Sequence, residues 1–110
     1  MRVLISPNSM KGSIDAHGFA DAVGKGLIEA GITDIIKLPL ADGGDGTANV
    51  LSAYYNAGFI PVTVVDPLGR NIESGYYSDN NGNAILEMAD ASGLKLLKPS
   101  EYSVLNTSSY

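Results

Sequence analysis

The sequence contains no cysteine and only one histidine, His17. Without cysteine there is no disulfide framework, no thiolate nucleophile and no zinc site of the cysteine type. One histidine also leaves no room for a histidine-based metal cluster or for a relay that uses two histidines. Carboxylates, hydroxyls and lysine remain as the groups that could carry chemistry.

Basic residues are few as well, and long apolar runs are missing. Seven Lys and Arg stand against 12 Asp and Glu, which gives a net charge of −5 with no basic cluster. Nucleic acids and anionic membranes both require a concentrated basic surface, so neither is expected as a partner. No apolar run approaches the length of a membrane span, and residues 1–7 are too briefly apolar for a signal peptide. We therefore expect a cytoplasmic protein.

The first part of the chain alternates short apolar strands with amphipathic helices. Strands are predicted at residues 2–6, 35–38 and 59–65, and helices at residues 16–30 and 47–57. A strand–helix–strand–helix–strand order is typical of a parallel sheet with right-handed crossovers. With 110 residues, of which 45% are apolar, the chain suffices for one modest core. The predicted fold class is α/β, with a βαβαβ parallel sheet.

The start of the first helix is predicted from its polar residues. Ser13 is expected to be the N-cap, with Asp15 in the first turn, where a carboxylate suits the helix dipole. Gly18, Gly24 and Gly26 each weaken this helix relative to alanine, but they allow it to pack closely on a sheet.

The pattern changes at residues 66–70, where Asp-Pro-Leu-Gly-Arg suits a tight turn. Two further strands, at residues 71–78 and 84–88, flank a hairpin signal at residues 79–83. A short helix is predicted at residues 89–94. We therefore predict a segment of the parallel type at residues 1–68, followed at 69–110 by the beginning of a second α/β domain that looks truncated.

The turn at residues 41–47 is the richest candidate for a site. It combines Gly43, Gly44 and Gly46, which let the backbone approach a ligand, with the carboxylates of Asp42 and Asp45. Either carboxylate could hold Mg²⁺ or accept a substrate proton. The backbone N–H groups of residues 44–47 are predicted to point at an anion. The alternative is an ordinary connecting turn in which Asp45 or Thr47 caps the next helix.

Two other stretches carry candidate residues. Lys11 could supply a charge for a phosphate or carboxylate, and Ser9 or Ser13 a hydroxyl, although a solvated lysine and a capping serine fit as well. Glu87 stands in an otherwise apolar predicted strand, where a carboxylate needs a partner. Neither a P-loop nor a GxGxxG fingerprint is present.

Taken together, four stretches resemble the bacterial glycerate kinases, a family that includes the tartronate-pathway enzymes. They are Ser-Pro-Asn-Ser-Met-Lys-Gly-Ser at 6–13, Leu-Pro-Leu-Ala-Asp-Gly-Gly-Asp-Gly-Thr at 38–47, Asp-Pro-Leu-Gly-Arg at 66–70 and Ile-Leu-Glu-Met-Ala-Asp-Ala-Ser-Gly-Leu at 85–94. The resemblance implies ATP-dependent phosphorylation of D-glycerate. It also implies a Rossmann-like domain into which a second α/β domain is inserted.

The resemblance implies roles for the candidate residues. Asp42 and Lys11 would be catalytic, Asp45 would bind Mg²⁺, and ATP would be the phosphoryl donor. The remaining matched positions would bind substrate or nucleotide: Ser9, Ser13, Gly43, Gly44, Gly46, Thr47, Glu87 and Ser92.

Several positions depart from the family pattern. The family usually has aspartate at Asn8, phenylalanine at Met10 and glutamate at Asp45. Asn8 keeps the shape of aspartate but loses its charge, so a metal-ligand or base role there is not expected of this chain. Asp45 keeps the charge on a shorter arm.

The chain also covers only the N-terminal third of the family pattern. We expect it to be inactive by itself and to need the remainder of the same enzyme as a partner. The edges of its sheet, left unpaired, would invite self-association. A non-catalytic anion-binding or regulatory module is the alternative function.

Overall fold

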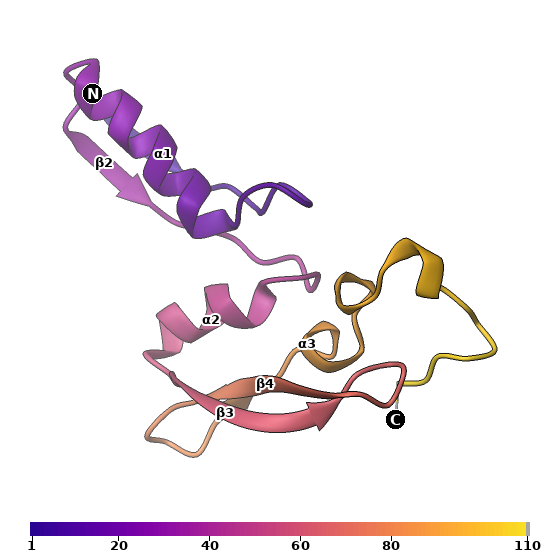
Figure 1. Cartoon of the computed structure of the whole chain (residues 1–110). Coiled ribbons are helices and arrows are strands. Elements are labelled where there is room, and N and C mark those ends of the chain that lie inside the picture. The colour runs from indigo at the N-terminus through magenta and orange to yellow at the C-terminus, as the bar shows by residue number, and fades with distance from the viewer. Residues whose placement is uncertain (110) are drawn as a thin grey trace. The chain divides into compact units, whose positions relative to one another are not determined.

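The computed structural model describes residues 1–109 and divides the chain into two compact units, Met1–Leu51 and Ser52–Tyr110. Helices and strands occur in both, so the α/β class is confirmed (Figure 1). No helix in the described part of the chain is long and apolar enough to span a membrane. The units are described separately below.

The first unit contains a two-stranded parallel sheet. Strands β1 (Arg2–Ile5) and β2 (Asp34–Lys37) pair in register from Arg2 opposite Asp34 to Ile5 opposite Lys37. Helix α1 (Ala16–Glu29) connects them and runs beside β2 (Figure 1). This strand–helix–strand unit follows the prediction.

Helix α1 lies close to the sheet at Gly24, as its glycines predicted. A Cβ added at Gly24 would lie 2.7 Å from Cε of Lys37 and 3.6 Å from Cδ1 of Ile5. Ala16, Ala20 and Gly24 are the buried residues of the helix, spaced four apart along one face. Small residues on this face therefore set the distance between helix and sheet.

The predicted N-cap of α1 was wrong. Asp15, not Ser13, caps the helix, and its carboxylate accepts a hydrogen bond of 2.6 Å from the N–H of Gly18. Ser13 instead closes an earlier turn by donating its N–H to the carbonyl of Met10 at 2.9 Å. That turn leaves Asp15 as the last extended residue before the helix. Gly31 follows the C-cap with a φ of +84°.

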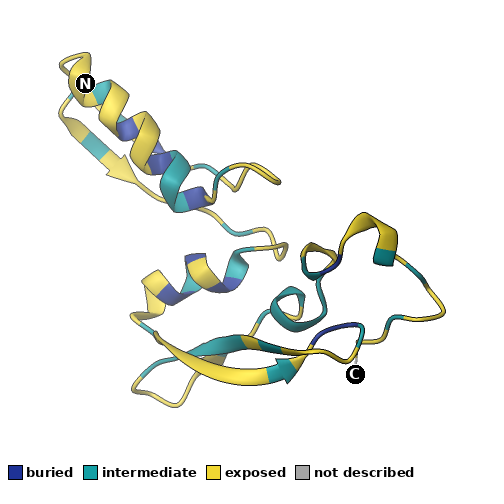
Figure 2. Ribbon diagram, viewed as in Figure 1, coloured by how far each residue is buried: buried dark blue, intermediate teal, exposed yellow. Residues whose placement is uncertain are grey.

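Helix α2 (Thr47–Tyr55) carries the chain from the first unit into the second. Its buried residues are Ala48, Val50 and Ser52, whereas Tyr54 is 52% exposed. Figure 2 shows that exposed and half-buried residues predominate along the chain.

The second unit is built on an antiparallel sheet, and this corrects the βαβαβ prediction. Strand β3 (Gly58–Val65) pairs along its whole length with β4 (Asn71–Ser78), and β5 (Ala84–Ile85) adds to the other edge of β4. β3 was expected to be the third parallel strand. The turn between the two strands has only five residues, so β4 pairs antiparallel with β3. A parallel strand would need a much longer crossover connection.

The predicted boundary at residues 68 and 69 falls inside this hairpin, whereas the compact units divide at residues 51 and 52. The turn signal at 66–70 was correct, but it marks a hairpin within a unit. The division of a longer protein into domains stays a prediction.

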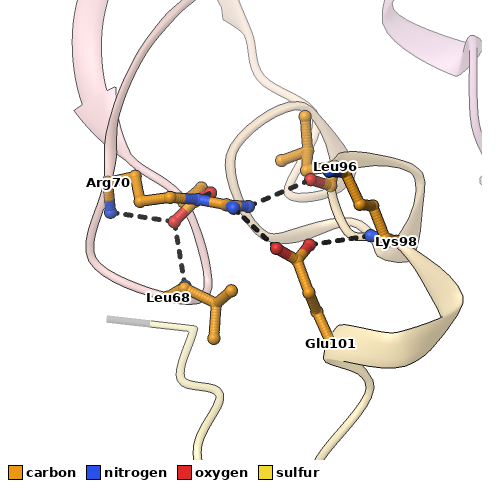
Figure 3. A network of polar contacts seen from close by, with 6 residues as sticks. Leu68, Arg70, Leu96, Lys98 and Glu101 are labelled. Atoms are coloured by element: carbon orange, nitrogen blue, oxygen red, sulfur yellow. Dashed lines mark hydrogen bonds and ion pairs between the residues drawn. The ribbon is translucent and has the colours of Figure 1, made fainter.

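The turn between β3 and β4 is tied to the end of the chain by a polar network (Figure 3). The carboxylate of Asp66, 1% exposed, accepts the N–H groups of Leu68 and Arg70 at 2.9 Å and pairs with Nε of Arg70 at 2.5 Å. Nη1 of Arg70 also contacts Glu101 at 2.9 Å, and Glu101 accepts the N–H of Lys98 at 2.8 Å. The network joins turn, guanidinium and C-terminal segment within the second unit.

The C-terminal segment is made of short turns. Helix α3 (Ala89–Ser92) confirms the predicted short helix, and the 3₁₀ turns η1 (Leu94–Leu96) and η2 (Pro99–Glu101) follow it. Glu87 was predicted in a strand, but β5 ends at Ile85, so Glu87 lies in the connection before α3.

Candidate functional site

The loops that follow β1 and β2 are held side by side by hydrogen bonds that continue the parallel pairing. The N–H of Leu38 donates to the carbonyl of Ile5 and the N–H of Leu40 to that of Pro7, both at 2.8 Å. The hydroxyl of Ser6 donates to the carbonyl of Leu38 at 3.0 Å. Two candidate loops, far apart in sequence, therefore meet at the carboxyl end of the sheet.

A pocket of about 230 Å³ lies between these loops and the first turn of α2. Of the predicted residues, Ser9, Asp45, Gly46 and Thr47 line it. Among these predicted residues, Ser9 and Thr47 contribute hydroxyls and Asp45 contributes a carboxylate. All of them lie within the first unit.

Other lining residues were not selected from the sequence as site residues. They include Asn8, Asp15 and Asn49, together with apolar residues such as Leu40 and Val50. Asn49 could have been found because it lies in the first turn of a helix that follows a glycine-rich turn. Asp15 had been assigned to the helix dipole, and its place beside the pocket depends on the turn before α1.

Asp42 does not line the pocket itself but follows Ala41, which does. Its Oδ1 accepts the N–H of Gly44 at 2.9 Å. The Gly44 N–H, and after it the Asn8 side chain, hold the pKa of Asp42 below its usual range. Asp42 is therefore ionised at neutral pH, and its Oδ1 is held by the N–H of Gly44.

The glycine-rich turn is closed by its own hydrogen bonds, which corrects the predicted anion cradle. The N–H of Gly44 goes to Asp42, that of Gly43 to Oγ1 of Thr47 at 3.0 Å, and that of Thr47 to the carbonyl of Gly44 at 3.1 Å. Gly43 and Gly46 both have a φ of +90°, which explains why glycine is needed there. Two of the N–H groups expected to face an anion, those of Gly44 and Thr47, are thus used inside the turn.

Lys11 and Ser13 lie in the exposed turn before α1, and neither lines the pocket. Glu87 and Ser92 are half-buried residues of the second unit and are not among the lining residues either. The pocket therefore contains only some of the predicted site residues.

Its charged lining residues, Asp15 and Asp45, are both acidic. Such a pocket favours a cation or a hydroxyl group and repels an anion that enters by itself. Among the described residues no group of three or more His, Cys, Asp or Glu could hold a metal. Mg²⁺ is often held by only one or two carboxylates together with substrate phosphates and water, so Asp45 fits a shared site and not a closed protein cage.

Comparisons with known proteins agree on one family. A sequence model of the glycerate kinase family matches residues 3–110. A glycerate kinase of Haemophilus influenzae is 38% identical over 112 residues, covering 100% of this chain and 30% of that protein. A glycerate 2-kinase of Escherichia coli is 33% identical over 111 residues, covering 99% and 29%.

A solved structure is similar along the same region. It is a crystal structure described as a glycerate kinase 2 from Salmonella typhimurium LT2, with a TM-score of 0.73 and 36% identity, covering 99% of this chain and 30% of that one. The chain thus spans about 30% of the length of the relatives it matches, in their N-terminal part.

Proposed function

Because the chain belongs to the glycerate kinase family, we propose that it forms part of the active site of an enzyme that transfers the γ-phosphoryl group of ATP to a hydroxyl of D-glycerate. The observation that carries this proposal is the pairing of two loops around one pocket, with the ionised Asp42 fixed beside it. Phosphoryl transfer needs chiefly positioned groups and charge stabilisation, and these loops supply positioned groups.

Asp42 is proposed as the proton acceptor. The glycerate hydroxyl oxygen attacks the γ-phosphorus, the bond from that phosphorus to the β–γ bridging oxygen breaks, ADP departs, and the hydroxyl proton passes to Asp42. Ser9 and Thr47 line the pocket and offer hydroxyls to orient the substrate. Gly43, Gly44 and Gly46 let the backbone of the turn at residues 41–47 approach the ligand closely.

Asp45 is the proposed contact for Mg²⁺, which would neutralise charge on the phosphate oxygens. The acidic lining of the pocket supports this assignment, since an anionic substrate needs a cation between itself and Asp45. Lys11 is proposed to act as a second cation, and Ser13, Glu87 and Ser92 to contact substrate or nucleotide, on the strength of the matched stretches alone.

The finer architecture is proposed on the same basis. In a longer protein, β1, α1 and β2 would belong to a Rossmann-like domain, with a further α/β domain inserted after it. The remainder of the enzyme would be the main partner, and a cytoplasmic location is proposed with it.

A chimeric enzyme tests the function. This chain would replace the matching N-terminal part of the Haemophilus influenzae glycerate kinase, and glycerate-dependent ATP turnover would be measured. We expect an active chimera, and a loss of about 100-fold or more in kcat on Asp42→Asn if Asp42 accepts the proton. The matched control is Asp21→Asn, which removes only an exposed ion pair with Lys37.

Full turnover in the folded Asp42→Asn chimera would refute the assignment of Asp42. The 110-residue chain alone is expected to show no turnover. If it bound glycerate tightly without turnover, as calorimetry would detect, the alternative of a non-catalytic binding module would be favoured.

A further inference from the structure

The matched stretch at residues 66–70 has no part in the proposed function, yet its arginine contacts two parts of the second unit. Nε of Arg70 pairs with the buried carboxylate of Asp66 at 2.5 Å, within the turn between β3 and β4. Nη1 of Arg70 pairs with Glu101 at 2.9 Å, and Nη2 donates to the carbonyl of Leu96 at 3.4 Å (Figure 3). Because the guanidinium is planar and rigid, the Asp66 contact holds both Nη atoms toward the C-terminal segment.

The same turn is contacted again near the end of the chain. The N–H of Ser108 donates to the carbonyl of Pro67 at 2.9 Å. We call residues 98–109 the strap, because this segment is attached to the 66–70 turn at Glu101 and once more at Ser108. Leu97, immediately before the strap, is only 8% exposed, so burial fixes the point from which the strap begins.

Between its two attachments the strap buries little apolar surface. Val104 is 97% exposed and Leu105 is 90% exposed. Hydrogen bonds in this part are internal to the strap: Oγ of Ser103 accepts the N–H groups of Leu105 and Asn106 at 3.3 and 3.2 Å. A segment with few buried apolar contacts opens at a lower free energy than the strands of the same unit. Polar contacts therefore carry much of the attachment.

We propose that the ion pair between Arg70 and Glu101 fastens the strap, and that the strap opens as one unit while the hairpin of β3 and β4 stays folded. The Glu101 carboxylate joins the two parts, because Oε1 meets Arg70 and Oε2 accepts the N–H of Lys98 at 2.8 Å. The Ser108 attachment is a hydrogen bond between neutral groups, which contributes less than one between charged groups. Loss of the Glu101 charge should therefore weaken the attachment at Ser108 as well.

The hairpin has contacts of its own that remain when the strap opens. Strands β3 and β4 pair along their whole length. The Asp66 carboxylate still accepts the N–H groups of Leu68 and Arg70, both at 2.9 Å, and still pairs with Nε of Arg70. Opening of the strap thus exposes Nη1 of Arg70 to solvent but leaves the turn closed.

Amide hydrogen exchange, followed by NMR in the 110-residue chain, tests the proposal. In Glu101→Gln, which keeps the shape of the side chain but removes its charge, we expect exchange of the Ser108 N–H to accelerate roughly 3- to 10-fold. The N–H groups of β3 and β4 should keep their rates. Ser108 donates to Pro67 and not to Glu101, so a purely local role of Glu101 would leave the Ser108 rate unchanged.

Glu73→Gln is the matched control. Glu73 in β4 accepts the hydroxyl of Thr63 in β3 at 2.9 Å, so the same change from acid to amide is made within the second unit but outside the strap. The exchange rate of the Ser108 N–H should be the same in Glu73→Gln as in the wild-type chain.

An unchanged Ser108 rate in Glu101→Gln would overturn the proposal. Equal acceleration of the strap and the hairpin would also overturn it, because the second unit would then open as a whole. If the variant fails to fold, the wild-type chain still decides: the Ser108 N–H should exchange through an opening of lower free energy than the N–H groups of β3 and β4, and equal free energies would reject a strap that opens by itself. The proposal does not depend on the proposed kinase activity, and its test uses neither ATP nor glycerate.

Discussion

At the scale of single residues, close packing leaves no room for a side chain at Gly75. It stands in β4 opposite Pro61, and an added Cβ would lie 2.3 Å from Cζ of Phe59 and 2.5 Å from the backbone carbonyl oxygen of Ile60. The Phe59 ring also meets the ring of Tyr77 edge to face, with centroids 5.3 Å apart, which restricts its escape. A side chain at this position would require both the Ile60 backbone and the packed Phe59 ring to move, which costs free energy.

Gly75→Ala is therefore predicted to lower the free energy of unfolding by about 1–3 kcal/mol. Gly58→Ala, in the partner strand β3, is the control, because its added Cβ would meet nothing within 4 Å. Urea unfolding of both variants measures the difference. Equal stability of the two would show that the Phe59 ring moves aside freely.

At the same scale, Asp66 makes the stability of the fold depend on pH. Burial of its side chain is the largest single effect and by itself raises its pKa, but the N–H of Arg70, the Arg70 side chain and the N–H of Leu68 together outweigh it, so the pKa of Asp66 lies below its usual value. A carboxyl whose pKa is lower in the folded state stabilises the fold fully above its unfolded pKa, about 3.9.

We predict that this contribution is lost as the pH falls from about 3.9 through the folded pKa of Asp66. The free energy of unfolding, measured by urea titration at a series of acid pH values, should fall in that window. Asp66→Asn should be less stable at neutral pH and should show a shallower acid dependence. An equally steep loss in Asp66→Asn would assign the acid sensitivity to other carboxyls.

At the scale of elements, the start of α1 depends on one carboxylate. Asp15 caps the helix through Gly18, whereas Ser13 contributes its backbone to the preceding turn. Asp15→Ala is predicted to cost about 1 kcal/mol in the free energy of unfolding, and Ser13→Ala much less. Thermal unfolding followed by circular dichroism measures both, and a larger effect at Ser13 would restore the cap predicted from the sequence.

At the scale of the whole molecule, the sheet of the first unit has one covered and one open face. Ile5 and Lys37 lie toward α1, as their approach to Gly24 shows, so the alternating residues Leu4 and Ile36 lie on the other face. Leu4 is 58% exposed and Ile36 45%, and they are register partners. An apolar pair on an open two-stranded sheet favours association with further chain.

We predict that the 110-residue chain associates with itself in a concentration-dependent way, and that Leu4→Lys and Ile36→Lys each weaken this association. Val104→Lys is the control, because Val104 is 97% exposed but lies outside any strand. Sedimentation velocity over a concentration series measures the effect. A monomer at all concentrations, or an equal effect of Val104→Lys, would contradict it.

The sequence alone determined the elements and the family resemblance. Runs of apolar residues, prolines and glycines are local signals, so β1, β2, α1 and the β4 hairpin appeared within a few residues of their predicted places. The four matched stretches are likewise contiguous, which is why a family of kinases was recognisable from residues 6–13 and 38–47 without any contact being known.

Only the tertiary structure decided how these pieces meet. The partner of β3, the cap of α1 and the use of the Gly44 and Thr47 N–H groups inside their turn depend on which of several competing hydrogen bonds forms. The pocket shows the same limit: Ser9, Asp45 and Thr47 were expected, but Asn8, Asp15 and Asn49 line it only because of how the loops and helix ends meet. Local patterns fix what a segment prefers, whereas pairing between distant segments depends on three-dimensional geometry, which no local spacing encodes.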